Sequence, residues 1–148
     1  MPATSNSSYI MCILGFYMTV TSNIGEVGDQ VTLLSPMHTY EKGSQLSFYF
    51  HMLIKDDGKT AALTVFTYSQ LHVYEQRLVE IRGNHGTSWQ QIRVCLPNGT
   101  YQLAFVATHG LQFLSDIAVD EIELYVDDEQ CRTSTNKGRY FTRRPTLQ

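Results

Sequence analysis

Hydrophobic and polar residues alternate along much of this chain with the period of two that is typical of β-strands. The clearest segment is Gln45–Leu53, in which apolar side chains occupy every second position. We expect one face of this strand to lie in the core, and that face carries Leu46, Phe48, Phe50 and Met52. The opposite face carries Ser47, Tyr49 and His51.

Further segments rich in β-branched and aromatic residues follow at intervals of roughly 10 residues. They are Ala61–Tyr68, Leu71–Arg82, Trp89–Leu96 and Tyr101–Thr108. Turn-forming residues separate them, most clearly at Pro97-Asn98-Gly99. No window predicts a convincing amphipathic helix, and we find no internal repeat. The pattern therefore predicts an all-β fold, a jelly-roll-like antiparallel β-sandwich.

The alternation changes phase within Asp116–Leu124. Ile117 and Val119 share one face of a regular strand, whereas Ile122 and Leu124 would fall on the other. A β-bulge near Asp120-Glu121 would return all four apolar residues to the core. The alternative is one strand that ends at Asp120 and a second that begins after it.

Length and composition indicate one globular domain: 148 residues, of which 43% are hydrophobic and 17% charged. The formal net charge of −3 argues against a nucleic-acid-binding protein, which usually has a strongly basic balance. Residues 132–148 differ from the rest because they hold five bases and no acid. We expect this segment to be a basic, flexible tail or linker rather than an interaction arm.

The longest apolar stretch, Tyr9–Val20, is shorter than the roughly 20 residues that span a bilayer. No Lys or Arg precedes it, which disfavours a secretory signal peptide. We therefore expect no transmembrane segment in this chain, and we expect the stretch to form a buried strand.

Motifs of enzyme active sites are missing. The sequence has no GxSxG nucleophile elbow, no phosphate-binding glycine loop and no HExxH or CxxC metal spacing. We interpret His51 as a structural residue that makes a hydrogen bond from its strand. A hydrolase that uses Asp116 and Asp120 as acid and base would lack any supporting nucleophile or histidine context.

The acidic cluster of Asp116, Asp120 and Glu121 offers the hard oxygen ligands that Ca²⁺ prefers. A solvated acidic edge is the better interpretation, because Ca²⁺ takes about six to eight ligands and too few are in reach. Two N-glycosylation sequons occur, at Asn6 and at Asn98. Asn98 lies in a predicted hairpin turn, the exposed position that glycosylation needs.

Several patches together resemble the MAM domain, which is named from meprin, A5 antigen (neuropilin) and receptor tyrosine phosphatase mu. In chain order they are GFYM at 15–18, VTLLSP at 31–36, LSFYFHM at 46–52, Trp89, the Tyr101–Ala107 strand, DIAVDEI at 116–122 and Cys131. The resemblance covers about residues 15–131. It implies a jelly-roll-like sandwich and a cation site that uses an acid of the DIAVDEI patch, with its other ligands in an opening segment.

The sequence also departs from the family pattern. The family's opening segment, with its first two cysteines, has no counterpart in residues 1–14, so we expect an N-terminally truncated module from a larger mosaic ectodomain, such as a MAM and LDL-receptor class A protein. The family places a cysteine where this chain has Gln45, so the resemblance implies that Cys131 has lost its disulfide partner. Cys12 and Cys95 stand at positions that the family does not use. We expect Cys95 to be a buried small apolar residue, and Tyr9–Leu14 to serve as a substitute edge strand.

The expected function is a non-catalytic, extracellular or cell-surface module for protein interaction, in adhesion or oligomerisation, with homophilic binding as one option. The expected divisions are an atypical segment 1–14, a MAM-like domain 15–131 and the tail 132–148. The alternative is a jelly roll that binds carbohydrate or another small ligand, with Trp89 and tyrosines stacking on a sugar. We expect no cofactor other than a possible Ca²⁺.

Overall fold

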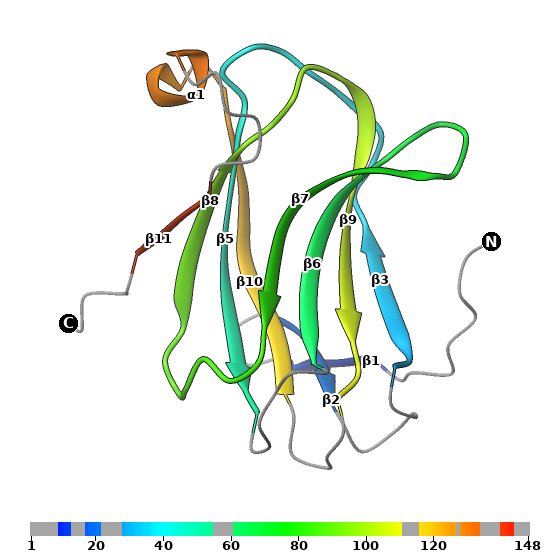
Figure 1. Ribbon diagram of the computed structural model, residues 1–148, viewed down its shortest axis with the longest axis vertical. Helices are drawn as coiled ribbons and strands as arrows, with labels where there is room; N and C mark the ends of the chain where they lie inside the picture. The colour runs from blue at the N-terminus through cyan, green and yellow to red at the C-terminus, as the bar shows by residue number, and fades with distance from the viewer. Residues whose placement is uncertain are drawn as a thin grey trace.

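The computed structural model describes residues 9–12, 17–21, 28–54, 61–110, 116–126, 128–133 and 140–143. Within these ranges the chain forms eleven strands and one short helix (Figure 1). Their bounds are β1 Tyr9–Cys12, β2 Tyr17–Thr21, β3 Gln30–Leu34, β4 His38–Tyr40, β5 Gln45–Leu53, β6 Ala62–Tyr68, β7 Tyr74–Arg82, β8 Gln90–Cys95, β9 Gly99–Thr108, β10 Asp116–Tyr125, α1 Glu129–Thr133 and β11 Tyr140–Arg143.

The strands form two antiparallel sheets. One sheet has six strands in the order β1-β2-β10-β5-β8-β11. The other has the order β3-β9-β6-β7, and β4 also pairs with β9. Every described pairing is antiparallel, and neighbours within a sheet are often far apart in sequence. This architecture confirms the predicted all-β sandwich of the jelly-roll type.

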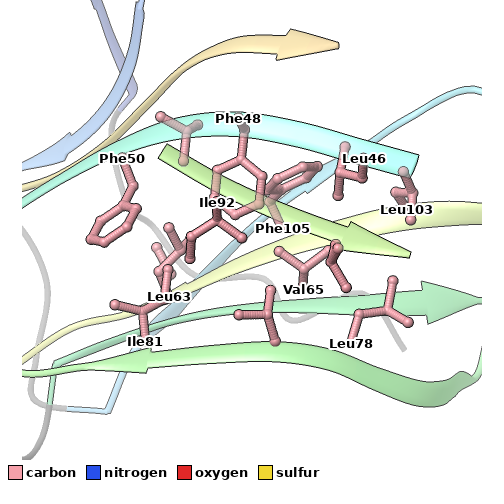
Figure 2. Packing of buried hydrophobic residues seen from close by; sticks show 14 of the residues in the cluster. Leu46, Phe48, Phe50, Leu63, Val65, Leu78, Ile81, Ile92, Leu103 and Phe105 are labelled. Atoms are coloured by element: carbon pink, nitrogen blue, oxygen red, sulfur yellow. The ribbon is translucent and has the colours of Figure 1, made fainter. Parts of the chain in front are cut away.

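The core fills the space between the two sheets (Figure 2). Leu46, Phe48, Phe50 and Met52 are all buried, as the alternation in β5 predicts. From the opposite sheet, Phe105 of β9 meets Phe48 edge-to-face with 5.2 Å between the ring centroids. Burial of these side chains is the main stabilising contribution of the fold, at about 1.5–3 kcal/mol for each large one.

The predicted bulge in β10 is present. The register of β10 against β5 shifts between Asp120 and Glu123, and Glu121 has a φ of +46°, in the left-handed region. After the bulge, Leu124 is paired with the inward-facing Leu46, so the apolar residues return to the inner face. However, Ile122 and Leu124 are 42% and 47% exposed, so the expectation that they join the core is wrong.

The two ends of the chain add strands to the six-stranded sheet. β1 pairs with β2, so Tyr9–Cys12 forms an edge strand, in agreement with the predicted substitute strand. At the other edge, β11 pairs with β8. The expectation of a solvated tail is therefore wrong for Tyr140–Arg143, because the open edge of β8 offers these residues backbone partners.

Candidate interaction surfaces

The turn between β6 and β7 carries the most exposed apolar side chain in the described part of the chain. Leu71 is 81% exposed and Val73 is 53% exposed. Figure 1 shows this turn projecting from the side of the sandwich. Large contiguous apolar patches are rare on the surfaces of monomeric proteins, and they mark interaction sites.

Hydrogen bonds hold the turn in one shape. The backbone N–H of Ser69 donates to the carbonyl of Val73 at 2.9 Å, and the N–H of His72 donates to the carbonyl of Ser69 at 2.9 Å. The Ser69 hydroxyl also accepts from the N–H of Leu71 at 3.2 Å. His72 takes a positive φ of 60° to complete the turn. The exposed side chains therefore stand on a closed and well-supported loop.

Tyr74 fixes the base of this turn to the outer face of the sheet. Its ring lies 4.9 Å from that of Phe66 and 5.2 Å from that of Tyr68, both on β6. Its hydroxyl is 3.3 Å from the Thr32 hydroxyl on β3, at the far side of the sheet. We name Leu71, Val73 and Tyr74, which is itself exposed, the hairpin patch.

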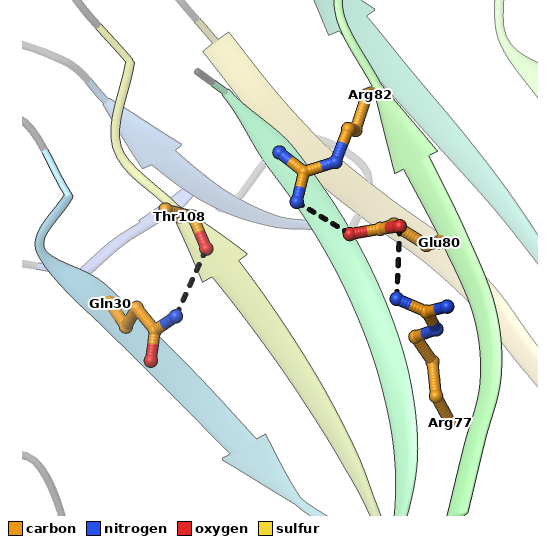
Figure 3. A network of polar contacts seen from close by, with 5 residues as sticks. All are labelled: Gln30, Arg77, Glu80, Arg82 and Thr108. Carbon is orange, nitrogen blue, oxygen red and sulfur yellow. Dashed lines mark hydrogen bonds and ion pairs between the residues drawn. The ribbon is translucent and has the colours of Figure 1, made fainter. Parts of the chain in front are cut away.

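Charged groups lie further along β7, on the same outer face (Figure 3). Glu80 forms ion pairs with Arg77 at 3.2 Å and with Arg82 at 2.7 Å. At the opposite edge of the same sheet, the Gln30 amide on β3 donates to the Thr108 hydroxyl on β9 at 3.3 Å. Because both arginine side chains are more than half exposed, these pairs contribute little to stability. Of these charged residues, Arg77 comes closest in sequence to the hairpin patch, three residues after Tyr74 along β7.

The outer face of the six-stranded sheet holds a second polar group of residues. The Arg93 guanidinium lies 5.9 Å from the ring centroid of Tyr125, in a cation–π geometry. The Tyr125 hydroxyl donates to the Glu123 carboxylate, and this hydrogen bond raises the pKa of the tyrosine. Next to them, the Gln91 amide donates to the Ser47 hydroxyl at 3.0 Å. The Nε atom of Arg93 is buried without a hydrogen-bond partner, and the contacts described in this cluster contain no nucleophile–base pair.

The predicted cation ligands are not brought together. Asp116 is paired with Leu53 and Asp120 with Tyr49, so the two acids lie four residues apart along β10, or about 13 Å. Ligands of one Ca²⁺ ion each lie about 2.3–2.6 Å from it, so these two cannot share an ion. Asp120 instead accepts the backbone N–H of Glu121 at 2.8 Å. Within the described ranges no three His, Cys, Asp or Glu residues form a metal-binding group.

The cysteine prediction is wrong. Cys131 is not unpaired but forms a disulfide with Cys95, with 5.2 Å between the Cα atoms. Cys95 is therefore buried as a half-cystine and not as a free apolar thiol. The reason lies in the sheet order, because β8 lies beside β5 and Cys95 is paired directly across from Gln45. The sequence carries no signal for this adjacency of strands.

The short helix α1 brings Cys131 to that position. Asp128 caps the helix, because its carboxylate accepts the N–H of Cys131 at 3.1 Å. The N–H of Asp128 in turn donates to the carbonyl of Gly43 at 2.9 Å, just before β5. The Gln45 amide then lies 3.6 Å from the Cys131 sulfur. The helix is thus fastened to the ends of β5 and β8.

The remaining predicted residues have ordinary surroundings. His51 forms a hydrogen bond with the Thr87 carbonyl at 3.2 Å, which confirms its structural role. Trp89 is half-buried, and its ring lies 5.5 Å from that of His51. Asn98 is exposed in the turn between β8 and β9, and the Thr100 hydroxyl of its sequon lies 2.8 Å from that of Thr39. Asn6 lies outside the described residues.

The chain is a two-sheet antiparallel sandwich with a disulfide that ties the helix after β10 to the sheet, and disulfides are usual in proteins of oxidising compartments. The family model described as "MAM domain, meprin/A5/mu" matches residues 4–132. The chain belongs to the MAM domain family, whose members are non-catalytic, extracellular adhesion-type domains.

Comparison with curated proteins gives the same family. The human MAM domain-containing glycosylphosphatidylinositol anchor protein 1 is 33% identical over 114 residues, which is 74% of this chain and 12% of that protein. MAM domain-containing protein 2 of mouse is 30% identical over 115 residues, covering 75% of this chain and 16% of the relative. Neuropilin-1 of Xenopus laevis is 29% identical over 111 residues, which cover 71% of this chain and 12% of that protein. The chain thus spans about an eighth of the length of the first relatives. Within its described residues, no helix is long and apolar enough to cross a membrane.

Proposed function

We propose that this chain is a non-catalytic extracellular module that binds a protein partner through the hairpin patch. The observation that carries the proposal is the exposure of Leu71 and Val73 on a turn whose backbone is held by hydrogen bonds. Family membership supports the class of function, because MAM domains are adhesion-type modules.

The chemistry of the patch favours a protein as its partner. Two aliphatic side chains and one tyrosine form an apolar centre, and the exposed charged residues Glu75 and Arg77 follow it on β7. An apolar centre with a polar rim is the usual composition of protein–protein interfaces. A turn that is already ordered also loses little conformational entropy when it binds. Adhesion and oligomerisation, including homophilic binding, are the roles that this surface would serve.

The setting of the module is part of the proposal. We infer that the chain works at the cell surface or in the extracellular space, within a larger protein. The relatives support this setting, since one group carries a glycosylphosphatidylinositol anchor in its name. Exposure of Asn98 in its turn supports an N-linked glycan at that residue.

A binding screen with the secreted chain tests the proposal. The oxidised chain, displayed as a multimer, would be applied to an array of cell-surface ectodomains and to beads coated with the chain itself. We expect binding to at least one protein, and a loss of about tenfold or more in affinity for the Leu71→Ser/Val73→Ser variant.

A matched control separates the patch from general surface hydrophobicity. Met37→Ser removes another exposed apolar side chain, on the segment between β3 and β4, and should leave the affinity unchanged. Equal affinity of the Leu71→Ser/Val73→Ser variant and the wild type would contradict the assignment to the hairpin patch. Aggregation of the coated beads would identify the partner as a second copy of the chain.

A further inference from the structure

Among the described residues, one edge of β10 has no paired strand over more than half of its length. On one side, β5 pairs with β10 from Asp116 to Tyr125. On the other side, β2 pairs only with Asp116–Val119. In the part of the chain that the structure describes, no strand pairs with Asp120–Tyr125 on that second side. We name this stretch the open edge.

The apolar side chains of β10 become more exposed beyond Val119, the last residue of β10 that pairs with β2. Ile117 and Val119 lie on the inner face of β10 and are 4% and 7% exposed. Ile122 and Leu124 return to the same inner face after the bulge, yet they are about half exposed. The clearest difference along this one strand is that a neighbouring strand is present beside the first pair. Apolar side chains on the inner face of a sheet are normally covered, so the open edge has the features of an acceptor for one more strand.

The negative charge around the open edge favours a positively charged binding partner. Residues 120–130 hold six acids and no base. Asp120, Glu123 and Tyr125 are paired with outward-facing positions of β5, so the carboxylates of both acids flank the outer side of the edge. The nearest described base on this face, Arg93, lies over the Tyr125 ring. An incoming strand would therefore meet an apolar inner side and an acidic outer side.

We propose that the open edge binds an extended segment of a partner protein in which apolar residues alternate with basic ones. The segment pairs with the backbone of Glu121–Tyr125 by strand addition. Its apolar side chains cover Ile122 and Leu124, and its Lys or Arg side chains lie beside Asp120 and Glu123. Alternation with a period of two matches both faces of the edge at once.

Two other occupants are disfavoured, one by its charge and one by its position in the sheet. A second copy that paired through the same edge would place acids beside acids, and like charges directly opposite each other destabilise a strand pair. The basic strand at the end of this chain, β11, is paired with β8, which β5 separates from β10. The open edge also belongs to the other sheet from the hairpin patch, so failure of this proposal leaves the proposed function standing.

A synthetic peptide with alternating Val and Lys tests the proposal on the full, oxidised chain. Hydrogen exchange of the backbone amides reports where the peptide lies, and fluorescence anisotropy reports its affinity. We expect the peptide to protect amides within Glu121–Tyr125. The same peptide with N-methylated backbone amides keeps its charge but cannot pair, and it should bind about tenfold or more weakly.

Charge variants complete the test. Glu121→Lys/Glu123→Lys should weaken binding of the peptide by about tenfold or more, whereas Glu75→Lys on β7 should change it less than about twofold. Circular dichroism of each variant establishes that the fold is kept, and Asp120→Asn provides a milder charge change should the double variant unfold. Equal binding of the N-methylated peptide, or protection outside β10, would overturn the proposal. Concentration-dependent dimers through the same edge without peptide would do the same.

Discussion

Gln45 and Cys95 face each other across β5 and β8, and the sulfur of Cys131 contacts both side chains. It is bonded to Cys95 and lies 3.6 Å from the Gln45 amide. The family resemblance implies a cysteine at position 45 as the partner of Cys131. In the structure, Cys131 in α1 is still one half of the disulfide, but its partner lies on β8 instead of on the neighbouring strand β5.

Loss of this disulfide should destabilise the domain. The bond joins residues 36 apart in sequence, so the chain-entropy relation predicts that Cys95→Ser costs about 3–4 kcal/mol of unfolding free energy. Urea denaturation of the oxidised protein measures this cost. Cys12→Ser, which leaves the bond in place, is the control. Alkylation under denaturing conditions should find one free thiol in each wild-type chain, and three would contradict the pairing.

The family arrangement should be recoverable. In the Gln45→Cys/Cys95→Ala variant, position 45 supplies the thiol that the family resemblance implies as the partner of Cys131, and the present Gln45 side chain points toward that sulfur. The new bond would join residues 86 apart, and we expect a stability within about 1–2 kcal/mol of the wild type. Peptide mapping without reduction checks the bond. Cys95→Ala alone serves as the control, and a double variant no more stable than it would refute the prediction.

The sequence predicts much of the fold, because burial in a strand follows a local alternation. The inward face of β5 and the bulge in β10 are both visible as periodicity and as its interruption. The order of strands in a sheet has no such local signal. For that reason the neighbours of β5 cannot be inferred from the sequence, which predicts Cys95 only as a buried small apolar residue. The alternation does not predict β11, because this strand depends on backbone pairing with the outer edge of β8.

The candidate surfaces were predicted less well than the core. The sequence marks Leu71–Arg82 as a strand, but the structure ends the preceding turn at Val73 and starts β7 at Tyr74. Nothing in the alternation distinguishes an apolar residue at an exposed turn, such as Leu71, from one in the core. The half-exposed Ile122 was likewise expected to be buried, because alternation gives the face of a residue but not what covers that face.

The backbone at the β10 bulge should favour glycine. Glu121 has a φ of +46°, a region that costs residues with a Cβ roughly 1 kcal/mol. We expect Glu121→Gly to be more stable than Glu121→Ala by about 0.5–1 kcal/mol. Both variants lose the same charge, so their difference in urea denaturation isolates the backbone effect. An alanine variant as stable as the glycine variant would argue against a left-handed conformation at this residue.

Gly110 should be intolerant of a side chain. A Cβ built there would lie 2.9 Å from the Ala61 Cβ, which is closer than such atoms approach, and 3.3 Å from the Ala61 nitrogen. We expect Gly110→Ala to cost about 1–3 kcal/mol of unfolding free energy. Adding Ala61→Gly removes the closer contact and should restore part of that loss. A double-mutant cycle with no coupling between the two sites would show that Gly110 does not lie against Ala61.

Tyr101 and Tyr40 should make the domain sensitive to alkaline pH. Their rings are stacked with 4.5 Å between centroids, and the Tyr101 hydroxyl donates to the Pro97 carbonyl at 2.6 Å. Burial raises the pKa of both hydroxyls, and the nearby Tyr40 adds to the shift at Tyr101. The folded state therefore holds these protons more tightly than the unfolded chain, in which the pKa of tyrosine is about 10.

The resulting contribution to stability is fully present below about pH 10 and is lost as the pH rises from there through the raised pKa of the folded state. Each tyrosine adds up to about 1.4 kcal/mol per pH unit to that decline. Tyr101→Phe should be less stable than the wild type by about 1 kcal/mol at pH 8, because its hydrogen bond is lost. It should also lose stability less steeply above pH 10. Urea denaturation across this pH range measures both effects, and Tyr74→Phe on the exposed hairpin is the control. Parallel declines in stability for Tyr101→Phe and the wild type would rule out Tyr101 as a source of the alkaline sensitivity.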